Sequence, residues 1–148
     1  MEIKSILFPT DFSEGSAEAL KYAVEFANRY GARLYVLHVI YDIAKASGWY
    51  VPHVSMDAIY KDIQEGAKKE LDNFGVNELG GLKNIERIVQ TGVPYQEIMS
   101  CAVKNKIDMI IIGTHGRTGI DRILFGSTAA QVVRNAPCPV LTVRIPKY

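Results

Sequence analysis

Hydrophobic and polar residues alternate in two distinct patterns along the chain. Short runs of apolar and β-branched residues predict five strands, at 3–8, 34–40, 85–89, 107–112 and 140–145. Between these runs, apolar residues recur every three or four positions, as they do on the buried face of a helix. This spacing predicts four helices: one after Ser13, one from Ser55 to Phe74, one with Pro94 in its first turn, and one over 127–135.

The apolar stripes of the helices and the polarity of the strands predict how these elements face the core. In the first helix we expect the buried stripe to be Ala17, Leu20, Ala23, Val24 and Ala27. In the second we expect it to be Met56, Ile59, Tyr60, Ile63, Ala67, Leu71 and Phe74. The strand at 85–89 has one polar face, which favours a sheet edge. The strand at 107–112 is the most apolar and is expected in a central position.

The order of these elements predicts a doubly wound α/β fold. Strands that alternate with helices are joined by right-handed crossovers, and such crossovers build a parallel sheet with helices on both faces. The 148 residues are enough for a single domain, 1–148, with its own core. A hydrophobic content of 48% and a charged content of 22% are ordinary for a soluble protein.

Composition also argues against several classes of partner. The net charge of +1 lacks the basic footprint of a nucleic-acid binder. Apolar runs of about six residues are too short to cross a membrane. Pro9 interrupts the apolar start too early for a signal peptide. Cys101 and Cys138 make no disulfide framework and are expected as buried thiols. We therefore expect a cytoplasmic protein with no nucleic-acid or membrane partner.

A ligand is expected beyond the carboxyl ends of the strands, where the strand order of a doubly wound sheet reverses. Three strand ends carry unusual residues: Pro9, Thr10 and Asp11; then His38, Val39 and Ile40; then Gly113, Thr114, His115 and Gly116. If the first and fourth strands are neighbours, their ends face each other across one crevice. Asp11 has a structural alternative as a helix cap, but an acidic residue at this position usually faces the crevice, so we favour ligand contact.

The end of the fourth strand has the composition of an anion site. Gly113 and Gly116 lack Cβ, so the backbone there can adopt positive φ and approach a ligand closely. Gly126, Ser127 and Thr128 then open a helix whose free N–H groups and dipole favour phosphate. The two hydroxyls can donate to a phosphate oxygen or bind a metal. Thr128 and Gln131 also have capping-box spacing, a structural role compatible with ligand binding.

Several nearby residues have both a functional and a structural interpretation. Arg117 adjoins Gly116 and either contacts the ligand or lies solvated beside Asp121; Arg122 is the weaker candidate. His115 is well placed in the loop, but the sequence offers it no catalytic partner. For His38, a bond to the backbone is favoured over catalysis. The segment 41–54, with Trp49 and Tyr50, is a lid, a partner surface or a packed loop. No catalytic residue and no metal ligand are assigned.

The glycine spacing resembles that of a known family. Two residues separate Gly113 from Gly116, nine more precede Gly126, and Ser127 follows directly. This pattern resembles the motif of the ATP-binding branch of the universal stress proteins. The likeness covers nearly the whole chain: it includes Ile-Leu-Phe-Pro-Thr-Asp-Phe-Ser near the start, Leu-His-Val-Ile at the second strand end and Ala-Pro-Cys-Pro-Val-Leu-Thr-Val in the closing strand.

The resemblance implies a Rossmann-like sheet of the adenine nucleotide alpha hydrolase type, with five parallel strands in the order 3-2-1-4-5. It implies ATP, or another adenine nucleotide, bound with Mg²⁺ or Mn²⁺. Asp11 and the Val39 backbone would contact adenine and ribose beside Pro9 and Thr10. Gly113 would lie against the ribose, and the phosphates would be held by Gly116, Gly126, Ser127 and Thr128, near Thr114, His115 and Arg117. A homodimer through the strand from Val140 to Ile145 is also implied.

Three functions remain open at this stage. The first is a nucleotide-dependent regulatory protein of the stress response, with slow ATP hydrolysis at most, because no general base for an attacking water can be named. The second is a nucleotide-processing enzyme such as an ATPase, although the Gly-Lys-Ser/Thr of a P-loop and the His-x-Gly-His of nucleotidyl transferases are absent. The third is a protein-interaction module without nucleotide. The intact glycine set favours the first.

Overall fold

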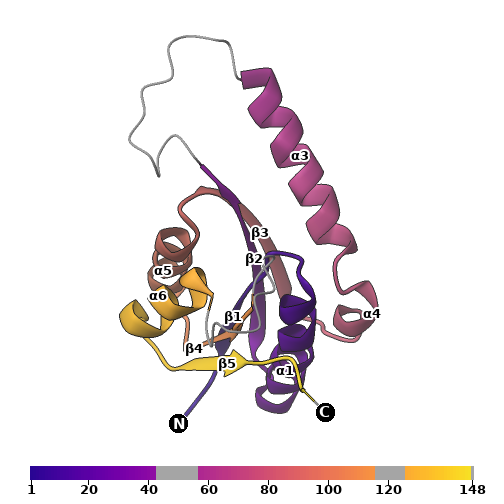
Figure 1. Cartoon of the computed structure of the whole chain (residues 1–148). Coiled ribbons are helices and arrows are strands. Elements are labelled where there is room, and N and C mark those ends of the chain that lie inside the picture. The colour runs from indigo at the N-terminus through magenta and orange to yellow at the C-terminus, as the bar shows by residue number, and fades with distance from the viewer. Residues whose placement is uncertain (43–56, 116–125, 148) are drawn as a thin grey trace.

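The computed structural model of the chain describes residues 1–42, 57–115 and 126–147. Within these ranges, five parallel strands form one sheet of order β3-β2-β1-β4-β5 (Figure 1). The elements in chain order are β1 (Ser5–Pro9), α1 (Glu14–Tyr30), β2 (Arg33–Tyr41), α3 (Asp57–Asn73), α4 (Val76–Leu79), β3 (Ile85–Gly92), α5 (Pro94–Lys104), β4 (Met109–Gly113), α6 (Ser127–Asn135) and β5 (Val140–Val143). The predicted fold class and strand order are confirmed.

Helices cover both faces of the sheet. α1, α3 and α4 lie on one face, and α5 and α6 lie on the other (Figure 1). Successive side chains of β1 point to opposite faces: Ile6 and Phe8 belong to the core under α1, while Leu7 belongs to the core under α5 and α6. All three side chains are fully buried. A strand covered on both faces reads as a continuous apolar run, and this explains the pattern of the sequence.

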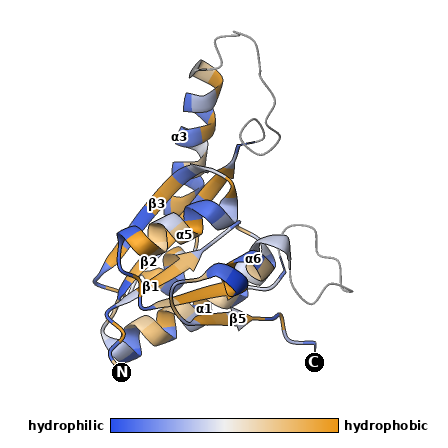
Figure 2. Cartoon of the chain, turned by 90° about the vertical axis from the view of Figure 1, so that its left-hand side faces the viewer, coloured by the Kyte–Doolittle hydropathy of each residue, from blue (hydrophilic) through white to orange (hydrophobic). Residues whose placement is uncertain are grey.

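The strand positions follow the polarity of each strand. β1 is central, and β4 lies between β1 and β5, so the most apolar run is interior as expected. β3 is an edge strand, paired with β2 from Leu34 opposite Ile85 to Tyr41 opposite Gly92. It extends beyond the predicted residue 89 because β2 pairs with it along its whole length. The orange of hydrophobic residues runs through β1 and β5 in Figure 2.

The first helix is closed at both ends by local signals in the sequence. The Ser13 side chain caps α1 by accepting a hydrogen bond from the Ser16 N–H, at 3.2 Å. Gly31 ends the helix in the left-handed conformation, with φ of 64°. The predicted stripe was wrong at Ala17, which is exposed. The face turned to the sheet passes through Ala19 instead, and an exposed alanine is tolerated because it leaves so little apolar surface in water.

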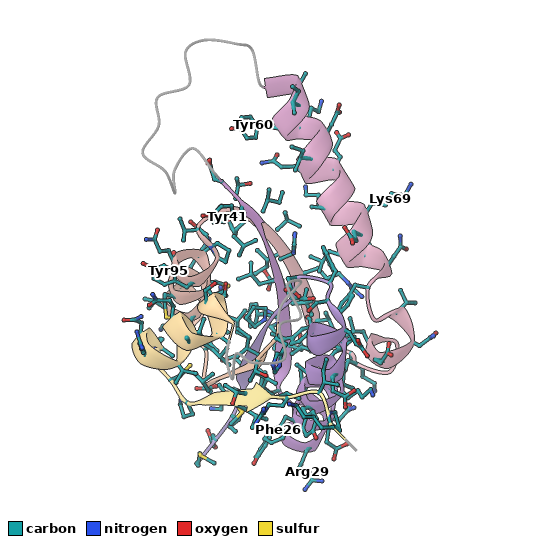
Figure 3. The ribbon with its side chains drawn as sticks, in the orientation of Figure 1. Phe26, Arg29, Tyr41, Tyr60, Lys69 and Tyr95 are labelled. Carbon is teal, nitrogen blue, oxygen red and sulfur yellow. The ribbon has the colours of Figure 1, made fainter. Side chains whose placement is uncertain are left out.

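The second helical stripe is buried over part of its length. Ala67 and Leu71 are buried, but Ile59, Tyr60 and Ile63 are exposed by 51%, 38% and 46%, which contradicts the prediction that they face the core. The reason is geometric: the N-terminal half of α3 stands beyond the end of the sheet (Figures 1 and 2). In Figure 3, Tyr60 and Lys69 project from opposite sides of α3. Ser55 and Met56 lie outside the described residues.

Helices α5 and α6 begin where the sequence predicted, whereas the short helix α4 was not predicted. Pro94 is the first residue of α5, and Ile98, Cys101 and Ala102 are buried against the sheet. Cys101 is a buried free thiol and Cys138 a half-buried one, and burial raises the pKa of both. Among the described residues, no helix has the length and apolar character needed to cross a membrane. Residues 43–54, with Trp49 and Tyr50, lie outside the described ranges.

Candidate functional site

The carboxyl ends of β1 and β4 form two walls of one crevice. The two strands are direct neighbours, with Ile6 paired to Met109 and Leu7 to Ile110. Beyond their ends lies a cavity of about 250 Å³. Of the twelve residues expected at a ligand site, the structure brings ten together around this cavity: Pro9, Thr10, Asp11, Val39, Gly113, Thr114, His115, Gly126, Ser127 and Thr128. The other two, Gly116 and Arg117, lie outside the described residues, as does Arg122.

Six further residues line the cavity and were not predicted: Ser16, Leu37, Pro94, Ile98, Ile112 and Ala129. Leu37 on β2 and Ile112 on β4 supply apolar surface. Pro94 and Ile98 come from the first turns of α5. A signal for them existed, because a helix that follows a parallel strand starts at the same edge of the sheet where the ligand is expected.

The turn between β1 and α1 is fixed by its own side chains. The Thr10 hydroxyl oxygen accepts hydrogen bonds from the Phe12 N–H at 3.1 Å and from the Ser16 hydroxyl at 2.6 Å. The Asp11 carboxylate accepts from the Ser13 N–H at 3.0 Å. Ser13, not Asp11, therefore caps α1, while Asp11 orders the turn and also lines the cavity. Side-chain hydrogen bonds within the turn therefore hold this wall of the site.

His38, on β2, forms a hydrogen bond with the same turn. Its Nδ1 lies 2.8 Å from the carbonyl oxygen of Thr10. A carbonyl oxygen can only accept, so Nδ1 carries the proton and donates it. The ring also stacks on Phe12, with centroids 4.3 Å apart. The prediction that His38 bonds to the backbone is confirmed.

The opposite wall is built from the two ends of the loop after β4. The Thr114 N–H donates to the Val143 carbonyl at 2.9 Å, and the Thr114 carbonyl accepts from the Gly126 N–H at 2.6 Å. Gly113 does not adopt positive φ; among the described glycines that conformation belongs to Gly31 and Gly75. A Cβ on Gly113 would point at the Gly15 carbonyl oxygen, 2.7 Å away. Gly113 therefore does not use the positive φ that glycine allows, and its lack of a side chain serves packing against α1.

The N-terminus of α6 closes the cavity. Gly126 is the N-cap and has no side chain to bond the first N–H groups, and Ser127 is the first helical residue. The capping-box interpretation of Thr128 and Gln131 was wrong. A capping box requires Thr128 at the N-cap, but the N-cap is Gly126, two residues before Thr128. The hydroxyls of Ser127 and Thr128 are thus not engaged in capping. Helix N–H groups and two hydroxyls at a cavity make an arrangement suited to phosphate.

His115 and the acidic residues show no catalytic arrangement in the described part of the chain. The His115 ring contacts its neighbour, with Nδ1 2.9 Å from the Thr114 hydroxyl oxygen. No group of three histidine, cysteine, aspartate or glutamate side chains placed to hold a metal ion is found among the described residues. The polar side chains at the cavity that suit an anion are the hydroxyls of Ser127 and Thr128 on α6 and the hydroxyl of Thr10 in the turn after β1.

A wider groove of about 920 Å³ adjoins the cavity. Five residues line both spaces: Asp11, Val39, Pro94, Ser127 and Thr128. The groove is bounded further out by α3, including Ile63 and Ala67, and by Tyr41 and Tyr95 from β2 and α5. Figure 3 shows Tyr41 and Tyr95 on the same side of the molecule, across from α3. The cavity therefore opens toward the exposed part of the α3 stripe.

Comparison with known proteins finds matches along nearly the whole chain. A model of the Universal stress protein family matches residues 2–144. The chain belongs to the universal stress protein family. Universal stress protein MJ0531 from Methanocaldococcus jannaschii is 36% identical, and the match covers 97% of this chain and 84% of that protein.

Solved structures of universal stress proteins share the fold over nearly their whole length. Universal stress protein UspA from Lactobacillus plantarum superposes with a TM-score of 0.82 at 27% identity, covering 97% of this chain and 99% of that one. A universal stress protein from Archaeoglobus fulgidus, solved in complex with dAMP, has a TM-score of 0.64 at 23% identity, covering 97% and 99%. At that identity, the second likeness shows the fold alone.

Proposed function

We propose that this universal stress protein binds an adenine nucleotide, with ATP and Mg²⁺ as the preferred pair, and acts as a nucleotide-dependent regulatory protein. The observation that carries the proposal is the uncapped N-terminus of α6, which faces the cavity together with the fixed turn after β1. The Archaeoglobus relative solved with dAMP supports the proposal, because it is a protein of this fold that holds an adenine nucleotide.

The phosphates belong at α6 in this proposal. The first N–H groups of a helix point out of its N-terminus and carry partial positive charge, so they favour an anion. Ser127 and Thr128 add hydroxyls beside these groups. Mg²⁺ usually keeps several waters and binds through phosphate oxygens, so it needs few ligands from the chain. A hydroxyl of Ser127 or Thr128 would supply one.

The base and ribose belong between the ends of β1 and β2. Val39 and Asp11 line the cavity there, and Leu37, Ile98 and Ile112 supply apolar surface for an aromatic base. The pairing of β1 with β2 ends at Pro9 opposite Leu37 and does not include Val39. The Val39 peptide group on that side can therefore form hydrogen bonds with the edge of the base. This arrangement requires no side chain specific for adenine.

The same geometry supports nucleotide holding over rapid hydrolysis. An efficient hydrolase needs a base within hydrogen-bond reach of the attacking water. Among the described residues at the cavity, the titratable candidates are Asp11, which orders the β1–α1 turn, and His115, which contacts Thr114. We infer turnover well below the common enzyme value of about 10 s⁻¹. The protein is further proposed to be a homodimer through the free edge of β5.

A charge placed at the first residue of α6 tests this proposal. Ser127→Glu should abolish ATP binding in calorimetric titration with Mg²⁺, because its carboxylate would repel the phosphates. An acidic residue in the first turn stabilises a helix, so the variant should remain folded. Ser127→Gln introduces a side chain of the same size as glutamate but without charge, and its ATP affinity should be within severalfold of the wild-type value. Equal ATP affinity in the wild type and Ser127→Glu, or no adenine nucleotide in mass spectra of freshly purified wild type together with no titration signal, would refute the site.

A further inference from the structure

The pairing of β1 with β2 stops one step short of Val39. Odd-numbered residues of β2 direct their peptide groups toward β1: the Arg33 N–H donates to the Lys4 carbonyl at 2.9 Å, and the Leu37 carbonyl accepts from the Thr10 N–H at 2.8 Å. Val39 is the next residue in this alternation. In a continued parallel ladder, its N–H would bond to the Thr10 carbonyl.

The Thr10 carbonyl instead accepts a hydrogen bond from the His38 side chain. Its Nδ1–H donates to the Thr10 carbonyl oxygen at 2.8 Å. The next ladder bond is replaced in the same way, because the Phe12 N–H, which would reach the Val39 carbonyl, is bonded to the Thr10 hydroxyl at 3.1 Å. Two hydrogen bonds from or to side chains thus replace two backbone hydrogen bonds of the sheet. As a result, neither the N–H nor the carbonyl of Val39 pairs with the β1 side.

The histidine ring is itself held in position. It stacks on Phe12, and Phe12 packs edge-on against Phe74 with centroids 5.5 Å apart. Phe12 has φ of 65°, a conformation that is strained for a bulky residue and persists only where the surroundings impose it. His38 lines the adjoining groove, while Thr10 and Val39 line the cavity of about 250 Å³. The hydrogen bond to the Thr10 carbonyl therefore links His38 to the cavity through the backbone of Thr10.

We propose that His38 is a positioning residue of the nucleotide site: by bonding the Thr10 carbonyl, it keeps the Val39 N–H free for the ligand and holds the turn that carries Asp11. The ligand part of this statement rests on the proposed function. Without the Nδ1 donor, the Thr10 carbonyl is left unpaired, and the Val39 N–H is the nearest replacement in the ladder. One added rung would draw the two strand ends together and remove the donor that the base requires.

Amide hydrogen exchange of the nucleotide-free protein tests the main-chain part, and ATP titration tests its consequence. His38→Asn places its side-chain N–H₂ where Nδ1 lies and removes the ring, whereas His38→Phe keeps the stacking ring and removes the donor. We expect the Val39 amide to be protected at least about tenfold more in His38→Phe than in the wild type, with ATP affinity about tenfold lower. In His38→Asn, both quantities should stay close to the wild-type values.

The outcomes separate this inference from the proposed function. Unchanged Val39 exchange in His38→Phe, or equal effects of His38→Asn and His38→Phe, would overturn it. A simple loss of packing would instead lower the melting temperature of both variants with no gain of protection at Val39. If wild-type protein bound no ATP, the proposed function would fail while the exchange comparison still decided the role of His38. His38→Leu, which lacks donor and ring, replaces the phenylalanine variant if that variant does not fold.

Discussion

Gly15 and Gly113 pack backbone against backbone at the point where α1 begins and β4 ends. A Cβ on Gly113 would lie 2.7 Å from the Gly15 carbonyl oxygen and 2.9 Å from its carbonyl carbon. A Cβ on Gly15 would in turn collide with the carbonyl oxygen of His115. The missing side chains allow the two walls of the crevice to approach each other. The first glycine of the motif thus has one role in packing, in addition to any contact with a ligand.

Gly113→Ala should lower the free energy of unfolding by about 1–3 kcal/mol, the usual cost of forcing an extra carbon into a packed contact. The neighbouring atoms belong to backbone, which cannot rotate away. Urea denaturation measures the effect. Gly81→Ala is the control, since a Cβ there meets nothing within 4 Å, and its stability should change by less than about 0.5 kcal/mol. Wild-type stability in Gly113→Ala would mean that α1 moves aside without cost.

Much of the fold was predictable because each element carries local and periodic signals that agree. Alternating strand and helix patterns fixed the topology class, and the polar face of β3 placed it at an edge. The strand order that the family resemblance implied made β1 and β4 neighbours, and it therefore predicted that Asp11 and Gly113 lie at one crevice. A fold can be predicted from its sequence when local signals, such as turn and cap residues, agree with the hydrophobic pattern of the whole chain.

The features that escaped prediction depend on relations that periodicity does not encode. The α3 stripe reads as buried through Ile59 and Ile63, but the sheet ends before it reaches them. Gly113 reads as a flexible glycine, while its role is set by Gly15, which is about a hundred residues away in sequence. Thr128 reads as a cap because its spacing fits, yet the helix starts one residue before it. For α3 and Gly113, a part of the fold distant in sequence decides the role, whereas for Thr128 the start of its own helix decides it.

The phosphate site proposed at α6 predicts that nucleotide affinity rises with the number of phosphates. ATP should bind more tightly than ADP, and ADP more tightly than AMP, since each phosphate adds charge near the helix N-terminus. Thr128→Val removes one hydroxyl at nearly constant volume and should weaken ATP binding about three- to tenfold, with a smaller effect on AMP. Titrations of the three nucleotides measure this. Thr91→Val, on β3, should leave all three unchanged; an equal loss for ATP and AMP in Thr128→Val would place the hydroxyl away from the outer phosphates.

Asp108 predicts a component of stability that depends on pH. Its carboxylate accepts from the N–H groups of Lys4 at 2.8 Å and Ser5 at 3.0 Å, and these bonds, led by Lys4, lower the pKa of Asp108 below its ordinary value. A lowered folded-state pKa stabilises the protein above the unfolded-state pKa, near 3.9, and this stabilisation is lost as pH falls through the folded-state value. Because the group is only partly buried, the contribution is modest.

Asp108→Ala should therefore destabilise the protein by about 1 kcal/mol at neutral pH. The difference in unfolding free energy between wild type and variant should stay constant from about pH 7 to pH 5 and shrink below about pH 4. Urea denaturation at several pH values gives the curve. Asp62→Ala, an exposed acidic residue on α3, serves as the control and should show little difference at any pH. A difference for Asp108→Ala that persists at pH 2 would assign its effect to packing rather than charge.

The free edge of β5 predicts how the proposed dimer can be dissociated without damage to the sheet. The carbonyls of Pro139 and Val143 accept from the β4 side, from the N–H groups of Ile110 and Thr114 at 2.9 Å each. Peptide groups alternate along a strand, so Thr142 directs its N–H to the open edge, where another chain can pair. Thr142→Pro removes this donor, and proline is tolerated at edge strands. Light scattering after size-exclusion chromatography should show a folded monomer for Thr142→Pro and a dimer for Thr142→Val, which keeps the N–H. A dimer that survives in the proline variant would place the interface elsewhere.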